Sequence, residues 1–262
     1  MIVSPHELWD LAQRLRGMRI VDLTQTFEPG IPHWSGYEDE TRRDALTLDA
    51  HGFWALYHTL AGAWGTHVDA PAHMYAEGRR VEDIRPDEMI MPLAVINIAP
   101  KVARDHDYAV ATEDVDEWES RHGPLPAGAF LALRTDWSKR WPDPTAMANL
   151  DEHGRAHTPG WSLPVLKLLY EQRGITASGH ETADPDPGSS TGRPIPPDRP
   201  LPEVMHEWYA CEAYILGRDR YEIELLTNLD QVPEAGAMAI ATFPKAGRAP
   251  NFPARVLAVC PD

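Results

Sequence analysis

The 262-residue sequence predicts a domain of the α/β class, or α+β, in which helices flank a mixed sheet. Short apolar runs recur along the chain, and most are continuous rather than alternating, which is typical of strands covered on both faces. Segments with helical spacing and capping residues lie between these runs. With 43% hydrophobic and 24% charged residues, the composition is that of a folded globular protein.

The helical segments are predicted from their ends. Ser4 can cap a helix that starts at Pro5 and ends at Gly17, because Glu7 stands three residues after the cap. Two further helices are expected between the apolar runs. Thr112 would cap residues 113–121 and Ser162 would cap residues 163–173, which Gly174 ends.

The apolar runs predict the strands, and proline with glycine predicts the loops. The expected strands are residues 19–24, 93–98, 130–134, 174–178, 237–243 and 255–259. Residues 28–36 are rich in proline and glycine and should form a loop that carries His33 and Trp34. Residues 185–202 should be a Pro-rich excursion from a single domain that spans 1–262, as a lid, a subunit arm or a mobile loop.

Charge and composition exclude several functions. The formal net charge of -16 repels polyanions, and no basic patch offsets it, so we expect no nucleic-acid partner. The sequence has neither an apolar run long enough to span a membrane nor a signal peptide pattern, so a cytoplasmic protein is expected. The two cysteines, Cys211 and Cys260, have no metal-ligand spacing and are expected to be ordinary thiols.

Residues 65–73 read Gly-Thr-His-Val-Asp-Ala-Pro-Ala-His and are the most informative stretch of the chain. In an extended backbone His67 and Asp69 leave the same face, so they can converge on one cation. An imidazole with a carboxylate suits Zn²⁺ or Mn²⁺, which can activate water. Beyond the turn at Pro71, His73 can return as a proton carrier. A surface hydrogen bond is the alternative reading of a His-x-Asp pair.

This motif resembles the signature of the metal-dependent cyclase-type hydrolases, a family that includes bacterial kynurenine formamidases, isatin hydrolases and some dienelactone hydrolases. Similarity continues through residues 78–84, 134–138 and 228–256, so that it covers most of the chain. The resemblance implies a swivelling β/β/α fold, usually in a homodimer or homotetramer. It also implies hydrolysis of a C–N or C–O bond in a small cyclic or acyclic amide or lactone.

The resemblance also implies roles for individual residues. Carried over by position, His67 and Asp69 would be metal ligands, and His73 would be the general acid or base. Glu224 takes the place of the family's distal carboxylate ligand; without the resemblance it would be a charge on a helix face or strand edge. The implied cofactor is a divalent metal, Zn²⁺ or Mn²⁺.

The sequence departs from the family at two positions. Ala63 stands where the family generally has a histidine, four residues before His67, and a methyl group cannot bind metal. Glu212 falls on a second family histidine and could bind through oxygen, unless His206 takes this role after a loop shift. The loss of an imidazole favours a single-metal or rearranged site. His180 or Glu181 could compensate, although His180 could equally be structural.

Two tryptophans are candidates for the walls of a substrate pocket. Trp34 lies on the loop at residues 28–36 and Trp64 lies inside the motif. Either could equally be a packed core residue. As pocket walls they would select a flat or cyclic substrate.

The expected mechanism is attack by metal-activated water, with His73 passing a proton to the leaving group. Two rival functions remain open at this level. A degenerate cyclase-fold protein could bind a ligand without catalysis, which the losses at Ala63 and Glu212 motivate. A lyase or isomerase could use the same cation on the same fold.

Overall fold

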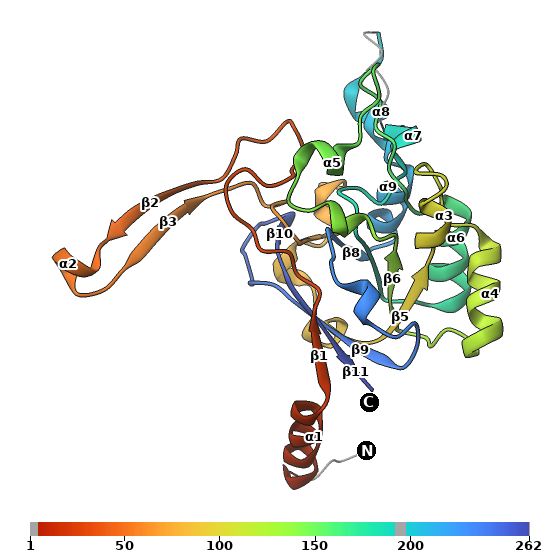
Figure 1. Cartoon of the computed structure of the whole chain (residues 1–262), viewed down its shortest axis with the longest axis horizontal. Coiled ribbons are helices and arrows are strands. Elements are labelled where there is room, and N and C mark those ends of the chain that lie inside the picture. Colours follow the sequence, from red (N-terminus) through yellow and green to blue (C-terminus); the bar gives the residue numbers. More distant parts are fainter. Residues whose placement is uncertain (1–4, 192–197, 262) are drawn as a thin grey trace.

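A computed structural model describes residues 5–191 and 198–261. The described chain forms a curled nine-stranded mixed sheet in the order β1-β11-β9-β5-β6-β7-β8-β4-β10, and a separate two-stranded ribbon of β2 and β3 (Figure 1). The strands are β1 (Arg19–Asp22), β2 (Thr41–Leu46), β3 (Ala55–Thr59), β4 (His67–Asp69), β5 (Ile90–Asn97), β6 (Phe130–Arg134), β7 (Ala177–His180), β8 (Tyr221–Glu224), β9 (Ala237–Thr242), β10 (Asn251–Pro253) and β11 (Arg255–Cys260).

Helices join the strands and cover the sheet. The α-helices are α1 (Pro5–Gly17), α2 (Leu48–His51), α3 (Ala99–Val102), α4 (Thr112–His122), α5 (Pro144–Ala148), α6 (Leu163–Lys167), α7 (Gly188–Thr191), α8 (Leu201–Trp208) and α9 (Ala210–Gly217). A π-helical segment, Leu168–Arg173, continues α6. Single 3-10 turns lie at Pro71–His73, Val81–Asp83, Pro86–Glu88, Trp137–Arg140 and Leu229–Gln231. The mixed α/β class expected from the sequence is confirmed.

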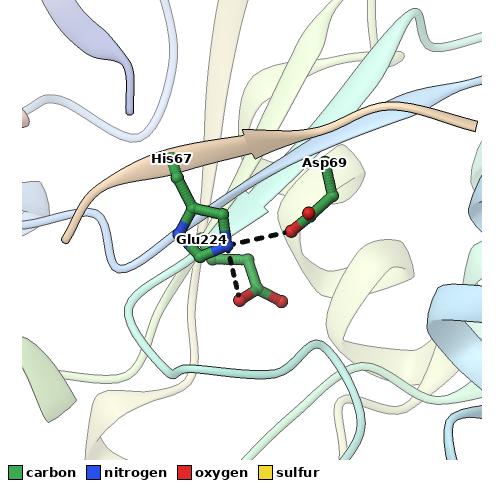
Figure 2. Close-up of side chains that lie close together, drawn as sticks. All are labelled: His67, Asp69 and Glu224. Carbon is green, nitrogen blue, oxygen red and sulfur yellow. Dashed lines mark ion pairs between the residues drawn. The ribbon is translucent and has the colours of Figure 1, made fainter. Parts of the chain in front are cut away.

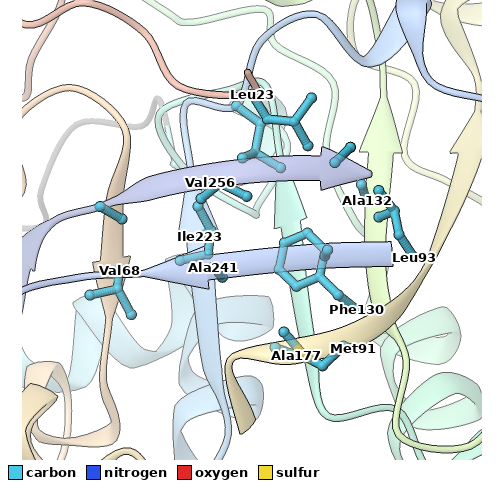
Figure 3. Packing of buried hydrophobic residues seen from close by; sticks show 14 of the residues in the cluster. Leu23, Val68, Met91, Leu93, Phe130, Ala132, Ala177, Ile223, Ala241 and Val256 are labelled. Carbon is cyan, nitrogen blue, oxygen red and sulfur yellow. The ribbon is translucent and has the colours of Figure 1, made fainter. Parts of the chain in front are cut away.

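The four central strands β5, β6, β7 and β8 run parallel, and the outer strands pair antiparallel. Alternate residues of a central strand feed two separate cores. On β6, Phe130 and Ala132 join a cluster with residues of β4, β8, β9 and β11 (Figure 3), whereas Leu131 and Leu133 pack under α4, α6 and α9. Burial on both faces explains why these strands are continuously apolar.

Most expected elements occur, with corrections at their ends. The helix at α4 begins at Thr112, and its N-cap is Ala111, whose N–H donates to the Asp114 carboxylate. Thr112 therefore does not cap this helix. The expected strand at 174–178 is displaced, because Gly174 ends the preceding helical segment in a left-handed conformation. The proposed cap Ser4 lies outside the described residues.

The ribbon of β2 and β3 was not expected, and it projects away from the body with α2 at its tip (Figure 1). Its large apolar side chains are mostly exposed. More than half of the surface of each of Leu48, Phe53, Trp54 and Tyr57 is accessible. A two-stranded ribbon is marginally stable alone, so a contact beyond its own strands would stabilise this arm.

The Pro-rich segment at 185–202 is described only at its two ends. Pro185, Asp186 and Gly188 are buried against the body, and α8 begins at Leu201. The Asp186 carboxylate accepts hydrogen bonds from the N–H groups of Cys211 and Glu212 at the start of α9. Within the described residues, no helix has the length and apolar character needed to cross a membrane.

Candidate metal centre

Strand β4 carries the motif, and its surroundings fix its direction. It pairs antiparallel with β8 on one side and with β10 on the other. Val68 therefore points into the apolar cluster, while His67 and Asp69 leave the opposite face. Gly65 precedes the strand with φ +62, and a Cβ there would lie 2.9 Å from Cβ of Phe27, so the turn into the strand requires glycine.

Three side chains of the site converge (Figure 2). His67 Nε2 lies 3.0 Å from Asp69 Oδ2 and 3.3 Å from Glu224 Oε2. All three residues are buried. His67 faces Glu224 directly across the β4–β8 pair, which explains how a distant carboxylate reaches the motif.

The ring of His67 is oriented by its own backbone. Its Nδ1–H donates to the carbonyl of Gly65 over 2.8 Å, so Nε2 is the nitrogen that faces both carboxylates. In this tautomer a neutral imidazole would aim the lone pair of Nε2 at two carboxylate oxygens. This arrangement is repulsive unless a positive charge lies between the nitrogen and the oxygens. Burial lowers the pKa of His67, but the charge and hydrogen bond of Asp69, together with the Gly65 carbonyl, offset it and raise this pKa above its ordinary value. A divalent cation can supply the positive charge between the two carboxylates.

His73 lies beside the three converging residues on the 3-10 turn after β4. Its Nε2 lies 3.5 Å from Glu212 Oε1 and 3.9 Å from Asp69 Oδ1. Asn251 Nδ2 donates to His73 Nδ1 over 3.2 Å, which leaves the ring proton on Nε2. The side chain of His73 is 30% exposed, so it can meet a bound molecule.

Buried carboxyl groups are concentrated here. Burial, followed by the charge of nearby carboxylates, raises the pKa values of Glu212, Glu222 and Glu224 well above the ordinary range. Burial raises the pKa of Asp69, but the charges of His67 and His73 outweigh it and lower this pKa to about 2. Asp69 Oδ1 has no hydrogen-bond partner among the described groups. The donors present therefore fit a divalent cation, which would stabilise the charged form of these carboxyl groups.

Several residues near this centre were not among the candidates from the sequence. Burial, followed by Asp186 and Asp69, raises the pKa of Asp184 to about 7. Tyr37 and Tyr209 lie close enough for the site's carboxylates to raise their pKa values, after burial as the main cause. Asp184 follows the end of β7, and that strand-end position is the one clue available from the sequence.

The remaining candidates lie around this centre or away from it. His180 Nε2 lies 3.5 Å from Glu224 Oε1, outside the three converging residues. Glu181 does not reach the centre, because its carboxylate accepts hydrogen bonds from Thr135 and Ser138. His206 is exposed on α8 and packs edge-on against the ring of Tyr75.

The two tryptophans differ in exposure. Trp64 is fully buried and its ring packs against His33, with centroids 4.5 Å apart and the planes tilted by 35°. Trp34 is 54% exposed and packs edge-on against Tyr37, 5.0 Å between centroids. Of these two aromatic residues, Tyr37 is the one whose pKa the carboxylates of the centre raise.

Comparison with known proteins gives consistent matches. The family described as "Putative cyclase" matches residues 21–187. An isatin hydrolase from Roseibium aggregatum is 32% identical over 203 residues, which cover 75% of this chain and 71% of that protein. A kynurenine formamidase from Geobacillus thermodenitrificans is 24% identical over 201 residues, 75% of this chain and 79% of that one.

Solved structures match over the whole chain. Isatin hydrolase A from Ralstonia solanacearum superposes with a TM-score of 0.87 at 32% identity, over 100% of both chains. An isatin hydrolase bound to the product analogue thioisatinate superposes with a TM-score of 0.86 at 26% identity, again over 100% of both.

Proposed function

On the premise that this chain belongs to the cyclase family, we propose that it is a metal-dependent hydrolase of a C–N or C–O bond in a small amide or lactone. The observation that carries the proposal is the convergence of His67, Asp69 and Glu224 on one point in a buried, strongly acidic centre. Such a centre is unfavourable without a cation.

We assign the metal ligands to His67 Nε2 and to the carboxylates of Asp69 and Glu224. Glu212 lies beside His73 and can complete the set through oxygen. A ligand set of one imidazole with carboxylates suits either Zn²⁺ or Mn²⁺. Because zinc sites are usually richer in thiolate or histidine ligands, the single imidazole favours Mn²⁺. When bound, the ion supplies Lewis-acid activation of water and of the scissile carbonyl.

His73 moves the proton in the proposed reaction. Its Nε2–H points toward Glu212 and Asp69, and Asn251 holds the opposite nitrogen. In hydrolysis the oxygen of water bonds to the carbonyl carbon while the C–N or C–O bond breaks. For this step the amide of Asn251 turns over, so that its Oδ1 accepts a hydrogen bond from His73 Nδ1–H and Nε2 carries a free lone pair. Nε2 then takes the proton that water releases and delivers it to the departing nitrogen or oxygen.

The substrate class is proposed from the relatives together with the lining of the site. Isatin hydrolases are among the most similar proteins, which favours a small cyclic amide fused to an aromatic ring. Tyr37 and Tyr209 lie near the ligands and can form flat walls, with Trp34 behind Tyr37. Trp64, which has no exposed surface, would act by shaping the loop that carries His33.

A chelation and add-back assay tests this function. Metal-free protein should be inactive toward a panel of isatin-type lactams, N-formyl arylamines and lactones, and Mn²⁺ or Zn²⁺ should restore turnover. Incorporation of ¹⁸O from labelled water into the acid product distinguishes hydrolysis from a lyase or isomerase reaction. A metal-free protein with full activity, or a product without label, would exclude the proposal.

We further propose that the chain acts as a homodimer. The exposed arm of β2 and β3 supports a second copy as its partner, because Phe53, Trp54 and Tyr57 are exposed and the chain is otherwise strongly acidic. The arm carries Arg42 and Arg43, so it is less acidic than the chain as a whole. A cytoplasmic location and the absence of nucleic-acid partners stay predictions from the sequence.

A further inference from the structure

Behind the proposed ligands lies a buried pair that the reaction above does not use, His180 and Glu222. Neither residue has any exposed surface. Neither nitrogen of His180 and neither oxygen of Glu222 has a hydrogen-bond partner in the described parts of the chain. Buried polar atoms without partners cost free energy, so a role in another state of the protein is expected of them.

Strand register places His180 beside Glu224, and Glu222 opposite Asp69. Glu222 and Glu224 leave the same face of β8, because they are two residues apart. Ser178 of β7 lies opposite Glu222 in the parallel pairing, so His180, two residues on, lies beside Glu224. His180 Nε2 is 3.5 Å from Glu224 Oε1, and its Nδ1 is 3.9 Å from Glu222 Oε2.

Glu224 therefore stands between two imidazoles. Its Oε2 faces His67, on the side of the converging ligands, and its Oε1 faces His180. A carboxylate that binds a metal through one oxygen needs a donor on the other oxygen to keep its orientation. His180 is the imidazole in position to be that donor.

We propose that His180 is a positioning residue, which donates a hydrogen bond from Nε2 to Glu224 Oε1 and so holds Glu224 in the orientation that binds metal. The inference rests on the proposed metal-dependent function. A small approach of the ring to the carboxylate brings this contact from 3.5 Å into hydrogen-bond range. Second-sphere partners of this kind change metal affinity about 10–100-fold.

Two other roles for His180 fit the geometry less well. A second cation shared by His180, Glu222 and Glu224 is disfavoured, because the two carboxylates face different nitrogens of one ring. Direct ligation of the first cation is also disfavoured, because His180 is not among the residues whose donor atoms converge. Complete burial lowers the pKa of His180 to about 3, in keeping with a neutral ring that has one N–H to donate.

Metal affinity of the full-length protein tests the proposal. Chelated protein would be titrated with Mn²⁺ and with Zn²⁺ against a chromophoric chelator, for wild type, His180→Leu and His180→Gln. Leucine fills similar volume without any donor, whereas glutamine keeps an N–H near the position of Nε2. His157→Gln is the matched control, because His157 also lies between two carboxylates, those of Asp107 and Asp151, away from the centre.

We expect His180→Leu to lower metal affinity 10–100-fold, His180→Gln to retain affinity within a few-fold, and His157→Gln to match wild type. The melting temperature of metal-free His180→Leu should equal or exceed that of wild type, because the ring nitrogens have no partner to lose.

The outcomes separate the two proposals. Wild type that binds neither ion would overturn the proposed function itself. Wild type that binds metal while His180→Leu binds it equally well would overturn the positioning role alone. Equal losses in the leucine and glutamine variants would also overturn it, since the donor would not matter. An unfolded His180→Leu would show that His180 is needed for folding, and the positioning role would be rejected.

Discussion

His67 and Glu224 stand directly opposite each other on the antiparallel strands β4 and β8, with Nε2 3.3 Å from Oε2. This pairing joins the motif at residues 65–73 to a carboxylate far along the chain. Because both side chains are buried on the same face, their separation is set by the sheet and does not depend on flexible loops.

The first prediction concerns Glu224. Glu224→Gln should lower metal affinity at least about 100-fold, because an amide oxygen is a weak ligand, and should remove the associated turnover. The metal-free variant should melt no lower than wild type, because burial and neighbouring carboxylates already raise the pKa of Glu224 and disfavour its charge. Metal titration and calorimetry measure both effects.

Glu181→Gln is the control for this variant. The Glu181 carboxylate is buried but accepts hydrogen bonds from Thr135 and Ser138. Its substitution should lower the melting temperature and leave metal affinity unchanged. If the two variants behaved alike, the separation between a metal ligand and a structural carboxylate would be wrong.

A second prediction separates proton transfer from metal binding. His73→Gln should lower kcat about 10²–10⁴-fold, because it removes the proposed proton carrier, while metal affinity changes only a few-fold. Asn251→Ala, which removes the donor to His73 Nδ1, should lower kcat by less. Steady-state kinetics on the lactam panel with parallel metal titrations checks this, and loss of the metal from His73→Gln would contradict it.

Asp184 gives a pH-dependent prediction for the metal-free protein. Its pKa of about 7 in the folded chain lies above the unfolded value of 3.8, so its contribution to stability is complete below pH 3.8 and is lost as the pH rises through 7. Asp184→Asn stays neutral. It should therefore match wild type near pH 4 and melt several degrees higher near pH 8.

Asp87→Asn is the control for the pH series. Asp87 is exposed, and its hydrogen bond to Arg85 lowers its pKa, so its effect should have the opposite sign and be small. Melting temperatures across the pH range measure the difference. If the difference in melting temperature between Asp184→Asn and wild type stayed constant with pH, the raised pKa of Asp184 would be rejected.

The arm of β2 and β3 predicts the assembly state. The double variant Phe53→Ser with Trp54→Ser should shift the protein from dimer to monomer, because it removes exposed aromatic surface at the end of the arm. Light scattering after size-exclusion chromatography gives the mass. Leu150→Ser, at a residue 59% exposed outside the arm, should leave the dimer intact. A monomeric wild type would contradict the proposed dimer.

Close packing beside the centre predicts a stability defect. In β7 a Cβ at Gly179 would lie 2.6 Å from the ring of Phe130 and 2.8 Å from Leu226. Gly179→Ala should therefore lower stability by about 1–3 kcal/mol. Gly17→Ala, where no atom lies within 4 Å, should be neutral or slightly stabilising. Chemical denaturation measures the free energy of unfolding of both variants. Equal effects would show that Phe130 and Leu226 can move away from the added methyl group, and would contradict the prediction.

Sequence patterns located the apolar elements well and the polar strands poorly. Residues 130–134 form β6 as expected, because burial on both faces demands an apolar run. β8 was missed, since Glu222 and Glu224 make it read as polar although all its residues are buried. The arm strands were missed for a related reason: β2 carries charged residues and covers no core.

Sequence by itself determined the local relationships. The spacing of His67 and Asp69 places both side chains on one face wherever the segment is extended, because strand side chains alternate. The motif also indicated the family, which the comparisons confirm. The neighbours of these two residues were decided by tertiary structure alone.

Pairing of β4 with β8 and of β8 with β7 brings Glu224 against His67 and sets His180 behind it. Strand register and the close approach at Gly179 result from packing between segments far apart in the chain, and no local pattern encodes them. The same packing removes water from the carboxylates around Asp184, and that loss of solvent is the main cause of their raised pKa values.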